Sequence, residues 1–387
     1  MPGLPRTSDL TMPVEAKSLR IAAFGFRSLP PSEGGAGADK FALELLPRLA
    51  ALGHQVVAYN RVYPNTQSTG KNSEFDGVKV RSFRTVAAKG FDTFFHSLRV
   101  TYDIIIHNTA DVVHIQNGGN SLFAVFLRLF GKRTYLSQDG LDWEREKWPF
   151  YAKIYLRAMA QLTARIHNEV IFDNVFARTY FEKRFNRSYA FVPFGADVDY
   201  KNDPNRIVQK LNLDFGEYFL FVGRFIPDKG LQYLIPAFER TITKNNLVLV
   251  GGSPNPSTFE RSVRKTSDCR ILFPGFIYGP DMHALMRHCY AYVQPSDVEG
   301  LSPVILESSF LGAPVICSDI EQNKYILGDT GIYFRQGDVD HLNQVLREAI
   351  ADPAWLRERG AAQRARIAER FSWDKVVANH VEIFSRN

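Results

Sequence analysis

The chain has 387 residues, of which 45% are hydrophobic and 23% charged, so we expect a globular protein of two or three domains. Its three cysteines, Cys269, Cys289 and Cys317, are odd in number and have no CxxC spacing, which argues against a disulfide framework or a zinc site and favours a reducing compartment. We expect all three to be small core residues. Residues 1–17 contain three prolines and no apolar core of a signal peptide. We interpret them as a flexible leader and expect a cytoplasmic protein.

The formal net charge of +6 is unevenly distributed along the chain. Residues 1–195 carry 25 Lys and Arg against 17 Asp and Glu, whereas residues 196–387 carry 22 against 24. This asymmetry suggests that the first half faces an anionic ligand or surface, such as the inner face of the cell membrane. A solvated basic face with no partner explains the same count equally well.

The first half alternates short β-type runs with helical patterns, which is typical of a parallel sheet covered by helices. The first such unit is a strand at 19–26, a helix at 39–53 and a strand at 55–60. Gly53 ends the helix. Further strands are predicted at 78–83, 111–116, 133–137, 169–172 and 189–194, with a long helix at 148–167.

A second alternation begins near residue 218, after a polar linker at 195–206. Strands are predicted at 218–223, 246–252, 270–276, 291–295 and 313–319, with helices at 230–240 and 303–310. Ser302 is a good N-cap and Pro303 suits the first helical position. The pattern therefore predicts two doubly wound α/β domains, residues 18–195 and 196–371, whose strand-to-helix loops meet across a cleft.

In the second domain, charged residues follow two predicted strands. Arg224 and Lys229 follow the strand at 218–223, and two cations beside a helix N-terminus suit a pyrophosphate. Glu299 precedes the helix that begins at Pro303, and Glu307 lies inside it. Carboxylates accept hydrogen bonds from hydroxyls, so the four groups together predict a ligand that carries both a diphosphate and sugar or ribose hydroxyls.

In the first domain, the loop after the first strand contains Gly34 and Gly35, which allow close approach of backbone N–H groups to a phosphate. This loop is not GxGxxG, and no acidic residue ends the second strand, so a nicotinamide dehydrogenase is disfavoured. His114, Gln116 and Asn117 end another strand. For His114 a core position and a catalytic role are equally compatible with the pattern.

The segment SQDGLDWEREKW follows the predicted strand at 133–137. Its Asp139, Asp142 and Trp143 suit the hydroxyls and the ring face of a sugar, although an ordinary surface loop has the same composition.

Three motifs together resemble the nucleotide-sugar-dependent glycosyltransferases of family 4: GRFIPDKG, PGF within ILFPGFIYG, and QPSDVEGLSPVILES. The segments ELLPRLAALGHQV and GLDWEREKWPFYAKIYL resemble the rhamnosyltransferase-like subgroup of that family. The likeness runs from about Leu19 to the C-terminus, where 372–387 resembles the helix that returns to the first domain. The sequence departs from the family at Leu301 and Ser302, at Gln116, and at Asp139.

This resemblance implies the GT-B fold and a retaining, metal-independent transfer of a sugar from a nucleoside diphosphate sugar, with no other cofactor. Arg224 and Lys229 would stabilise the departing diphosphate, Glu307 would bind the ribose, and Glu299 would contact the donor sugar. His114 is a further catalytic candidate. The remaining donor-site candidates are Gly34, Gly35, Phe276, Ile277, Gly300, Leu301 and Ser302. The acceptor-site candidates are Gln116, Asn117, Asp139, Asp142 and Trp143.

We expect the acceptor to be a saccharide or a lipid-linked saccharide in polysaccharide biosynthesis, and we expect no nucleic acid partner. If the acceptor is lipid-linked, the basic first half would contact anionic membrane. Two alternatives remain open. One is a nucleotide-sugar epimerase or a phosphorylase of the same fold, and the other is a nucleotide-sugar binding protein without turnover.

Overall fold

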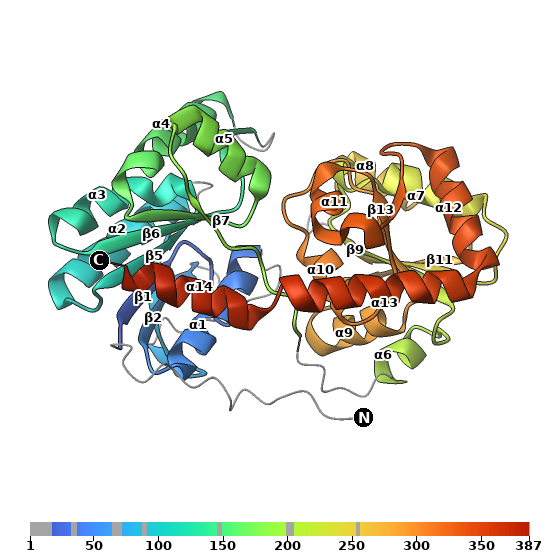
Figure 1. The fold of residues 1–387 in the computed structure, drawn as a ribbon, viewed down its shortest axis with the longest axis horizontal. Helices are drawn as coiled ribbons and strands as arrows, with labels where there is room; N and C mark the ends of the chain where they lie inside the picture. Colours follow the sequence, from blue (N-terminus) through green and yellow to red (C-terminus); the bar gives the residue numbers. More distant parts are fainter. Residues whose placement is uncertain are drawn as a thin grey trace. The chain divides into compact units, whose positions relative to one another are not determined.

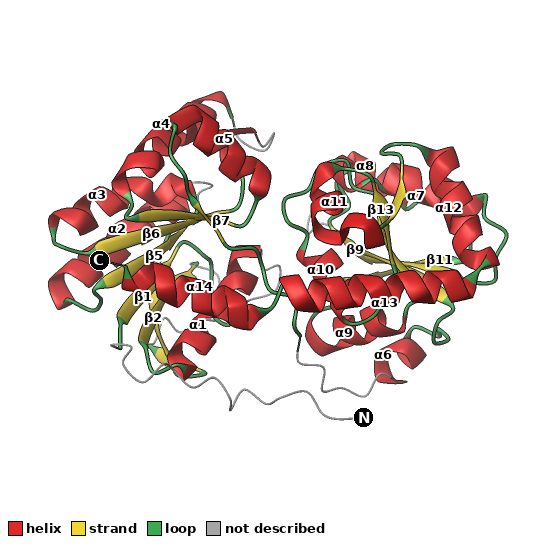
Figure 2. Cartoon of the chain, in the orientation of Figure 1, coloured by secondary structure: helices red, strands yellow, loops and turns green. Residues whose placement is uncertain are grey.

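The computed structural model describes residues 18–31, 37–63, 72–86, 91–144, 149–198, 205–252 and 256–386. They form two compact units (Figure 1, Figure 2). The first unit contains the residues up to Phe194 together with those from Trp373 onwards, and the second unit contains Gly195–Ser372. The leader at 1–17 and the loop glycines Gly34 and Gly35 lie outside the described residues.

The first unit is built on an eight-stranded sheet in the order β3-β4-β2-β1-β5-β6-β7-β8. Every pairing is parallel except that of β3 with β4. The strands are β1 (Arg20–Phe24), β2 (Gln55–Val62), β3 (Ser73–Phe75), β4 (Val78–Arg84), β5 (Val112–Gln116), β6 (Arg133–Gln138), β7 (Glu169–Phe172) and β8 (Ala190–Phe191).

Helices cover both faces of this sheet because parallel strands need crossover connections. The helices are α1 (Gly37–Ala51), α2 (Phe91–His107), η2 (Gly118–Asn120), α3 (Ser121–Leu129), η3 (Asp142–Glu144), α4 (Phe150–Ile166), α5 (Val175–Phe185) and α14 (Trp373–Ser385). Buried side chains of α2, α3, α4 and α5 share one core with the sheet. On α14, Trp373 and His380 pack against Phe41 of α1, with ring centroids 5.8 and 5.6 Å apart.

The second unit has a six-stranded, entirely parallel sheet in the order β11-β10-β9-β12-β13-β14. The strands are β9 (Tyr218–Gly223), β10 (Asn246–Gly251), β11 (Ile271–Gly275), β12 (Ala291–Gln294), β13 (Val315–Ser318) and β14 (Ile332–Phe334). The helices are α6 (Asn205–Lys210), η4 (Pro227–Lys229), α7 (Leu231–Glu239), α8 (Thr258–Val263), α9 (Gly279–His288), α10 (Pro303–Phe310), α11 (Glu321–Leu327), η5 (Gly328–Thr330), α12 (Val339–Ala351) and α13 (Pro353–Arg370). Strands β12 and β13 are buried throughout, and β9 and β10 over most of their length, as expected for parallel strands between two helical layers.

The prediction of two doubly wound α/β units is confirmed by these sheets. The predicted strand at 189–194 is shorter in the structure, where only Ala190–Phe191 pairs with β7. Cys289 and Cys317 are buried, but Cys269 is exposed, so the expectation of three core cysteines is wrong for that residue. Among the described residues, no helix is both long and apolar enough to cross a membrane.

Candidate functional site

The order of the second sheet reverses between β9 and β12. From β9 the chain proceeds outward through β10 and β11, and it then returns to the other side of β9 with β12. Ligands of open α/β sheets bind at such a reversal, outside the carboxyl ends of the strands. The loops that leave β9 and β12 carry Lys229 and Glu299 respectively, so topology directs both groups to one place.

A glycine without room for a side chain brings these two loops together. Gly230 has a φ of 73°, and a Cβ atom there would lie 1.9 Å from the carbonyl oxygen of Pro295. The loops are also joined by a backbone hydrogen bond, in which the N–H of Asp297 donates to the carbonyl oxygen of Asp228 over 2.9 Å. Glycine is therefore required at position 230 both by its backbone conformation and by this close packing.

Lys229 and Glu299 form an ion pair. Lys229 Nζ lies 2.5 Å from Glu299 Oε1, and the two side chains are 22% and 8% exposed. Gln294 Nε2 donates to the same carboxylate oxygen over 2.6 Å. Because an ammonium group has three N–H donors, Lys229 keeps donors for a ligand while it holds Glu299 in place.

Gln294 was not predicted as a site residue. Its Oε1 accepts hydrogen bonds from the Tyr292 hydroxyl and from Ser302 Oγ, at 2.6 and 3.2 Å. Its Nε2 then points to Glu299. An amide is suited to this position because it donates and accepts at once. Its place at the end of a buried strand was the signal available in the sequence.

Helix α10 begins where the sequence predicts. Ser302 caps it by accepting from the backbone N–H of Ile305, and Pro303 is the first helical residue. Since α10 follows β12, its N-terminus, with its partial positive charge, lies at the same sheet edge. Glu307 is buried in this helix, and the preceding Gly300 and Leu301 are half-buried.

Arg224 is exposed just after β9, and it has no ion-pair partner among the described residues. The loop after β11 carries an aromatic pair, in which the exposed rings of Phe276 and Tyr278 stack at 6.1 Å with an interplanar angle of 3°. Ile277 between them is half-buried. The second unit thus presents cations, carboxylates and an aromatic surface along the carboxyl edge of one sheet.

The first sheet has a corresponding reversal between β1 and β5. Gly25, just after β1, has a φ of 109°, and a Cβ atom there would lie 2.2 Å from the carbonyl oxygen of Gln116. Asn117 Nδ2 donates to the carbonyl oxygen of Gly25 over 3.1 Å. Gln116 is buried, and neither atom of its amide has a hydrogen-bond partner among the described residues. Gln116 and Asn117 therefore lie at the edge where a ligand of this unit would bind.

The catalytic expectation for His114 does not agree with the structure. Its ring is completely buried, its Nε2 lies 2.8 Å from Ser137 Oγ, and it packs against Phe41, His380 and Phe384. Burial lowers the pKa of His114 to about 3, and the neighbouring His380 acts in the same direction. The structure therefore places this residue in the core of the first unit.

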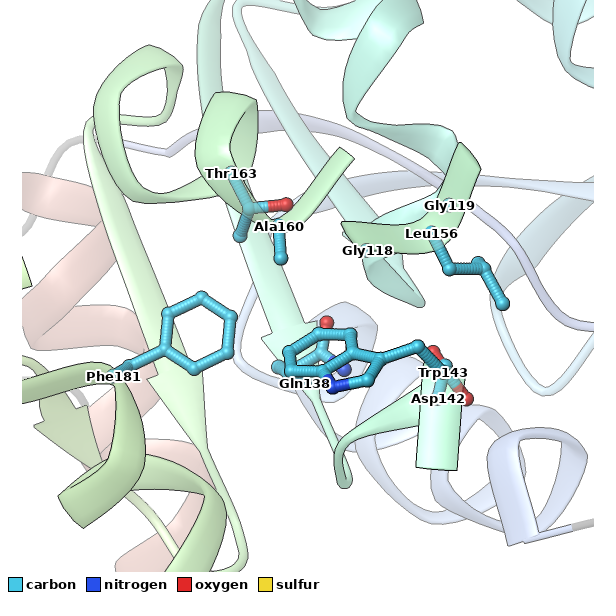
Figure 3. A pocket seen from close by; sticks show the side chains of 9 residues that line it. All are labelled: Gly118, Gly119, Gln138, Asp142, Trp143, Leu156, Ala160, Thr163 and Phe181. Carbon is cyan, nitrogen blue, oxygen red and sulfur yellow. The ribbon is translucent and has the colours of Figure 1, made fainter. Parts of the chain in front are cut away.

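Trp143 is also a core residue. Its indole is 6% exposed and packs against Tyr180 and Phe181, with ring centroids 5.6 and 6.2 Å apart. The indole and Asp142 line a cavity of about 10 Å³, which is too small for a sugar ring (Figure 3). The expectation that Trp143 offers its face to a sugar is corrected by this packing. Asp139 is exposed and Asp142 half-buried.

Among the described residues, no group of three or more His, Cys, Asp or Glu side chains is placed to hold a metal ion.

Comparison with known proteins finds a similarity to glycosyltransferases in the second unit. Residues 216–352 match the family model described as glycosyl transferases group 1, and residues 104–197 match a domain of unknown function, DUF1972. O-antigen chain mannosyltransferase B of Escherichia coli is 27% identical over 184 residues, which are 46% of this chain and 48% of that protein.

A second relative is the GDP-mannose-dependent alpha-(1-6)-phosphatidylinositol monomannoside mannosyltransferase of Mycolicibacterium smegmatis. It is 27% identical over 243 residues, which are 57% of this chain and 64% of that protein. The matches thus span between about half and just under two thirds of the length of these two relatives.

Among solved structures, sucrose-phosphate synthase of Thermosynechococcus elongatus superposes with a TM-score of 0.78 and 20% identity. The match covers 94% of this chain and 98% of the synthase. The chain therefore has the fold of the GT-B glycosyltransferases, and part of its second unit is similar to the glycosyl transferases group 1 family.

Proposed function

We propose that the chain is a retaining glycosyltransferase of family 4 that moves a sugar from a nucleoside diphosphate sugar to a saccharide or lipid-linked saccharide acceptor. The observation that carries the proposal is the contact between Lys229 and Glu299 at the strand-order reversal of the second sheet. Lys229 supplies a cation for a diphosphate and Glu299 supplies a carboxylate for sugar hydroxyls, and their charged groups lie 2.5 Å apart.

In this proposal the donor lies along the carboxyl edge of the second sheet. Lys229 and the exposed Arg224 bind the diphosphate. Arg224 has no ion pair among the described residues that would have to break first. Glu299 binds hydroxyls of the donor sugar, and Glu307 binds the ribose. The stacked rings of Phe276 and Tyr278 lie on the loop after β11, where they would border the nucleobase.

The reaction breaks the bond between the anomeric carbon and the diphosphate oxygen and forms a bond to an acceptor hydroxyl oxygen. The acceptor proton passes to the departing diphosphate, so the products are the glycoside and the nucleoside diphosphate. Negative charge grows on the leaving group in the transition state, and Lys229 and Arg224 stabilise it there. Attack from the face that the diphosphate leaves gives retention of configuration, without a protein nucleophile or a metal ion.

The names of the two relatives support an acceptor from polysaccharide or glycolipid synthesis and make GDP-mannose the first donor to test. On the acceptor side we assign Gln116, Asn117, Asp139 and Asp142. The Gln116 amide has no hydrogen-bond partner among the described residues, but both of its polar atoms are buried, so a ligand hydroxyl would reach it only if neighbouring side chains move.

The test is a donor assay with GDP-mannose, UDP-glucose, dTDP-rhamnose and ADP-glucose, in the presence of cell-envelope saccharide fractions as acceptors. We expect release of one nucleoside diphosphate coupled to transfer of the sugar, and loss of both in Lys229→Ala. Product from phosphate in place of an acceptor would identify a phosphorylase, and an isomerised donor would identify an epimerase. Donor binding without turnover in every combination would leave a nucleotide-sugar binding protein.

A further inference from the structure

Three of the helices that cover one face of the first sheet are neighbours. Helix α3 contacts α2 on one side and α4 on the other (Figure 1). Their inner residues, among them Ile104, Phe123 and Ala164, belong to the core of the unit. Their outer residues are not covered by any described element, and we call this outer face the α2-α4 face.

The α2-α4 face is unusually apolar. Among the described residues, 21 large hydrophobic side chains are exposed, and 13 of them lie on these three helices or at the C-cap of α3. They are Phe91, Phe94, Phe95, Leu98, Tyr102 and Ile106 from α2, Phe126, Leu129 and Phe130 from α3 and its cap, and Phe150, Tyr151, Ile154 and Tyr155 from α4. Phe150, Tyr151 and Leu129 are each about three quarters exposed. Single exposed apolar residues are ordinary, but this concentration marks an interaction surface.

Contacts between helices make the face continuous. Phe94 of α2 lies against Phe95 and against Phe123 of α3, with ring centroids 5.8 and 5.3 Å apart. Tyr155 of α4 donates a hydrogen bond of 2.9 Å to the carbonyl oxygen of Gly119, just before α3. The apolar residues of the three helices therefore belong to one surface.

The charges of the α2-α4 face have one sign. Helices α3 and α4 contain no acidic residue. The two acids of α2 point inward, where Asp92 pairs with Arg61 and Asp103 pairs with Arg81. On the outer side, Arg99, Arg128 and Arg157 are exposed and have no acidic partner among the described residues. Lys153 and Arg165 add further cations on α4.

We propose that the α2-α4 face docks on an anionic lipid membrane. Phe, Tyr, Leu and Ile side chains enter the interfacial region of a bilayer, and neighbouring Arg and Lys side chains bind anionic headgroups. A protein partner would fit the apolar residues, but the cations, which have no acidic partner among the described residues, favour a surface that is negatively charged over a wide area. Part of the excess of Lys and Arg in the first half of the sequence therefore lies on the α2-α4 face.

The proposal is independent of the transfer reaction, because it uses no residue of the donor or acceptor sites. It also has a geometric consequence that rests on the proposed function. Helices α3 and α4 follow β5 and β6, so their N-terminal ends lie at the carboxyl edge of the first sheet. Gln116, Asn117 and Asp142 lie at this edge, and an acceptor anchored in the membrane by its lipid would have its saccharide beside them.

Vesicle flotation of the full chain tests the proposal. Vesicles of phosphatidylglycerol and phosphatidylethanolamine should carry the protein upward, and vesicles of phosphatidylcholine alone should not. Arg128→Gln/Arg157→Gln should raise the lipid concentration for half-binding about 25-fold, which is about fivefold for each cation removed. Phe150→Ser/Tyr151→Ser should weaken binding at high salt as well, because its effect is not electrostatic.

The control is Ile242→Ser, which removes an apolar side chain that is even more exposed, at 96%, but lies in the second unit. It should float like the wild type, and circular dichroism should show all variants folded. Failure of the wild type to float with anionic vesicles, or flotation unchanged in both double variants, would overturn the proposal. A concentration-dependent dimer that Phe150→Ser/Tyr151→Ser abolishes would instead assign the face to a second copy of this chain. Donor binding measured without lipid tests the proposed function separately.

Discussion

Replacing Lys229 with alanine removes the cation that contacts Glu299. The Glu299 carboxylate, which is only 8% exposed, then keeps the hydrogen bond from the Gln294 amide but has no counter-charge from Lys229. Loss of one partner from a fully buried ion pair costs about 3–5 kcal/mol, and loss from a surface pair costs about 0–1 kcal/mol. Because Lys229 is 22% exposed, this pair lies between the two limits. We expect Lys229→Ala to lower the free energy of unfolding by about 2 kcal/mol, which is about 4–8 °C in Tm for a domain of this size.

A double-mutant cycle with Glu299→Gln tests the stated cause. A glutamine carries no charge, so the double variant leaves no carboxylate without its cation. It should be more stable than Lys229→Ala by about 1 kcal/mol. Calorimetry of the wild type, both single variants and the double variant gives the coupling energy. Strictly additive effects, or a Lys229→Ala variant as stable as the wild type, would show that the pair does not have the buried character described here.

Three further predictions use other parts of the structure. Arg224→Ala should change stability by less than about 0.5 kcal/mol because the side chain is exposed, yet weaken nucleoside diphosphate binding by about 1.5–3 kcal/mol in calorimetric titration. Arg240→Ala, which removes a surface pair elsewhere in the unit, should leave binding unchanged. Gly230→Ala should cost more than about 3 kcal/mol because its Cβ would collide with a carbonyl oxygen, whereas Gly216→Ala, also at positive φ but in open space, should cost about 1 kcal/mol by urea denaturation. Since burial lowers the pKa of His114 to about 3, the unfolded state binds its proton more tightly, and the contribution of His114 to stability should fall below pH 6.5 by about 2 kcal/mol at pH 5. The buried His96, His167 and His380 act in the same direction. The pH profile of His114→Asn should be correspondingly shallower, and an unchanged slope would contradict the assignment.

Local signals in the sequence predict the elements of the fold well. Ser302 and Pro303 define the start of α10, and the alternation of strands and helices predicts both doubly wound units. These features depend on hydrogen bonds and periodicities within a few residues, which a sequence displays directly. The predicted strand at 189–194 is too long because most of its residues are apolar. They pack in the core, but only Ala190 and Phe191 pair with a neighbouring strand.

Burial of individual polar and aromatic residues was harder to predict. His114 and Trp143 follow patterns compatible with a site, but α14 and α5, which are remote in sequence, cover them. The role of Gln294 depends on three side chains that meet only in the folded sheet. By contrast, Lys229 and Glu299 could be predicted as neighbours, because the rule for parallel sheets places the loops after adjacent strands at one edge.

The central claim is a nucleoside diphosphate sugar site at the strand-order reversal of the second sheet. Its most direct test is the thermal midpoint of the wild type and of Glu307→Gln with GDP-mannose, UDP-glucose, dTDP-rhamnose and ADP-glucose. At about 100 times its dissociation constant, the correct donor should add about 2.7 kcal/mol to the wild type, and Glu307→Gln should lose most of that gain. Stabilisation of both proteins to the same extent, or of neither by any donor, would contradict the site.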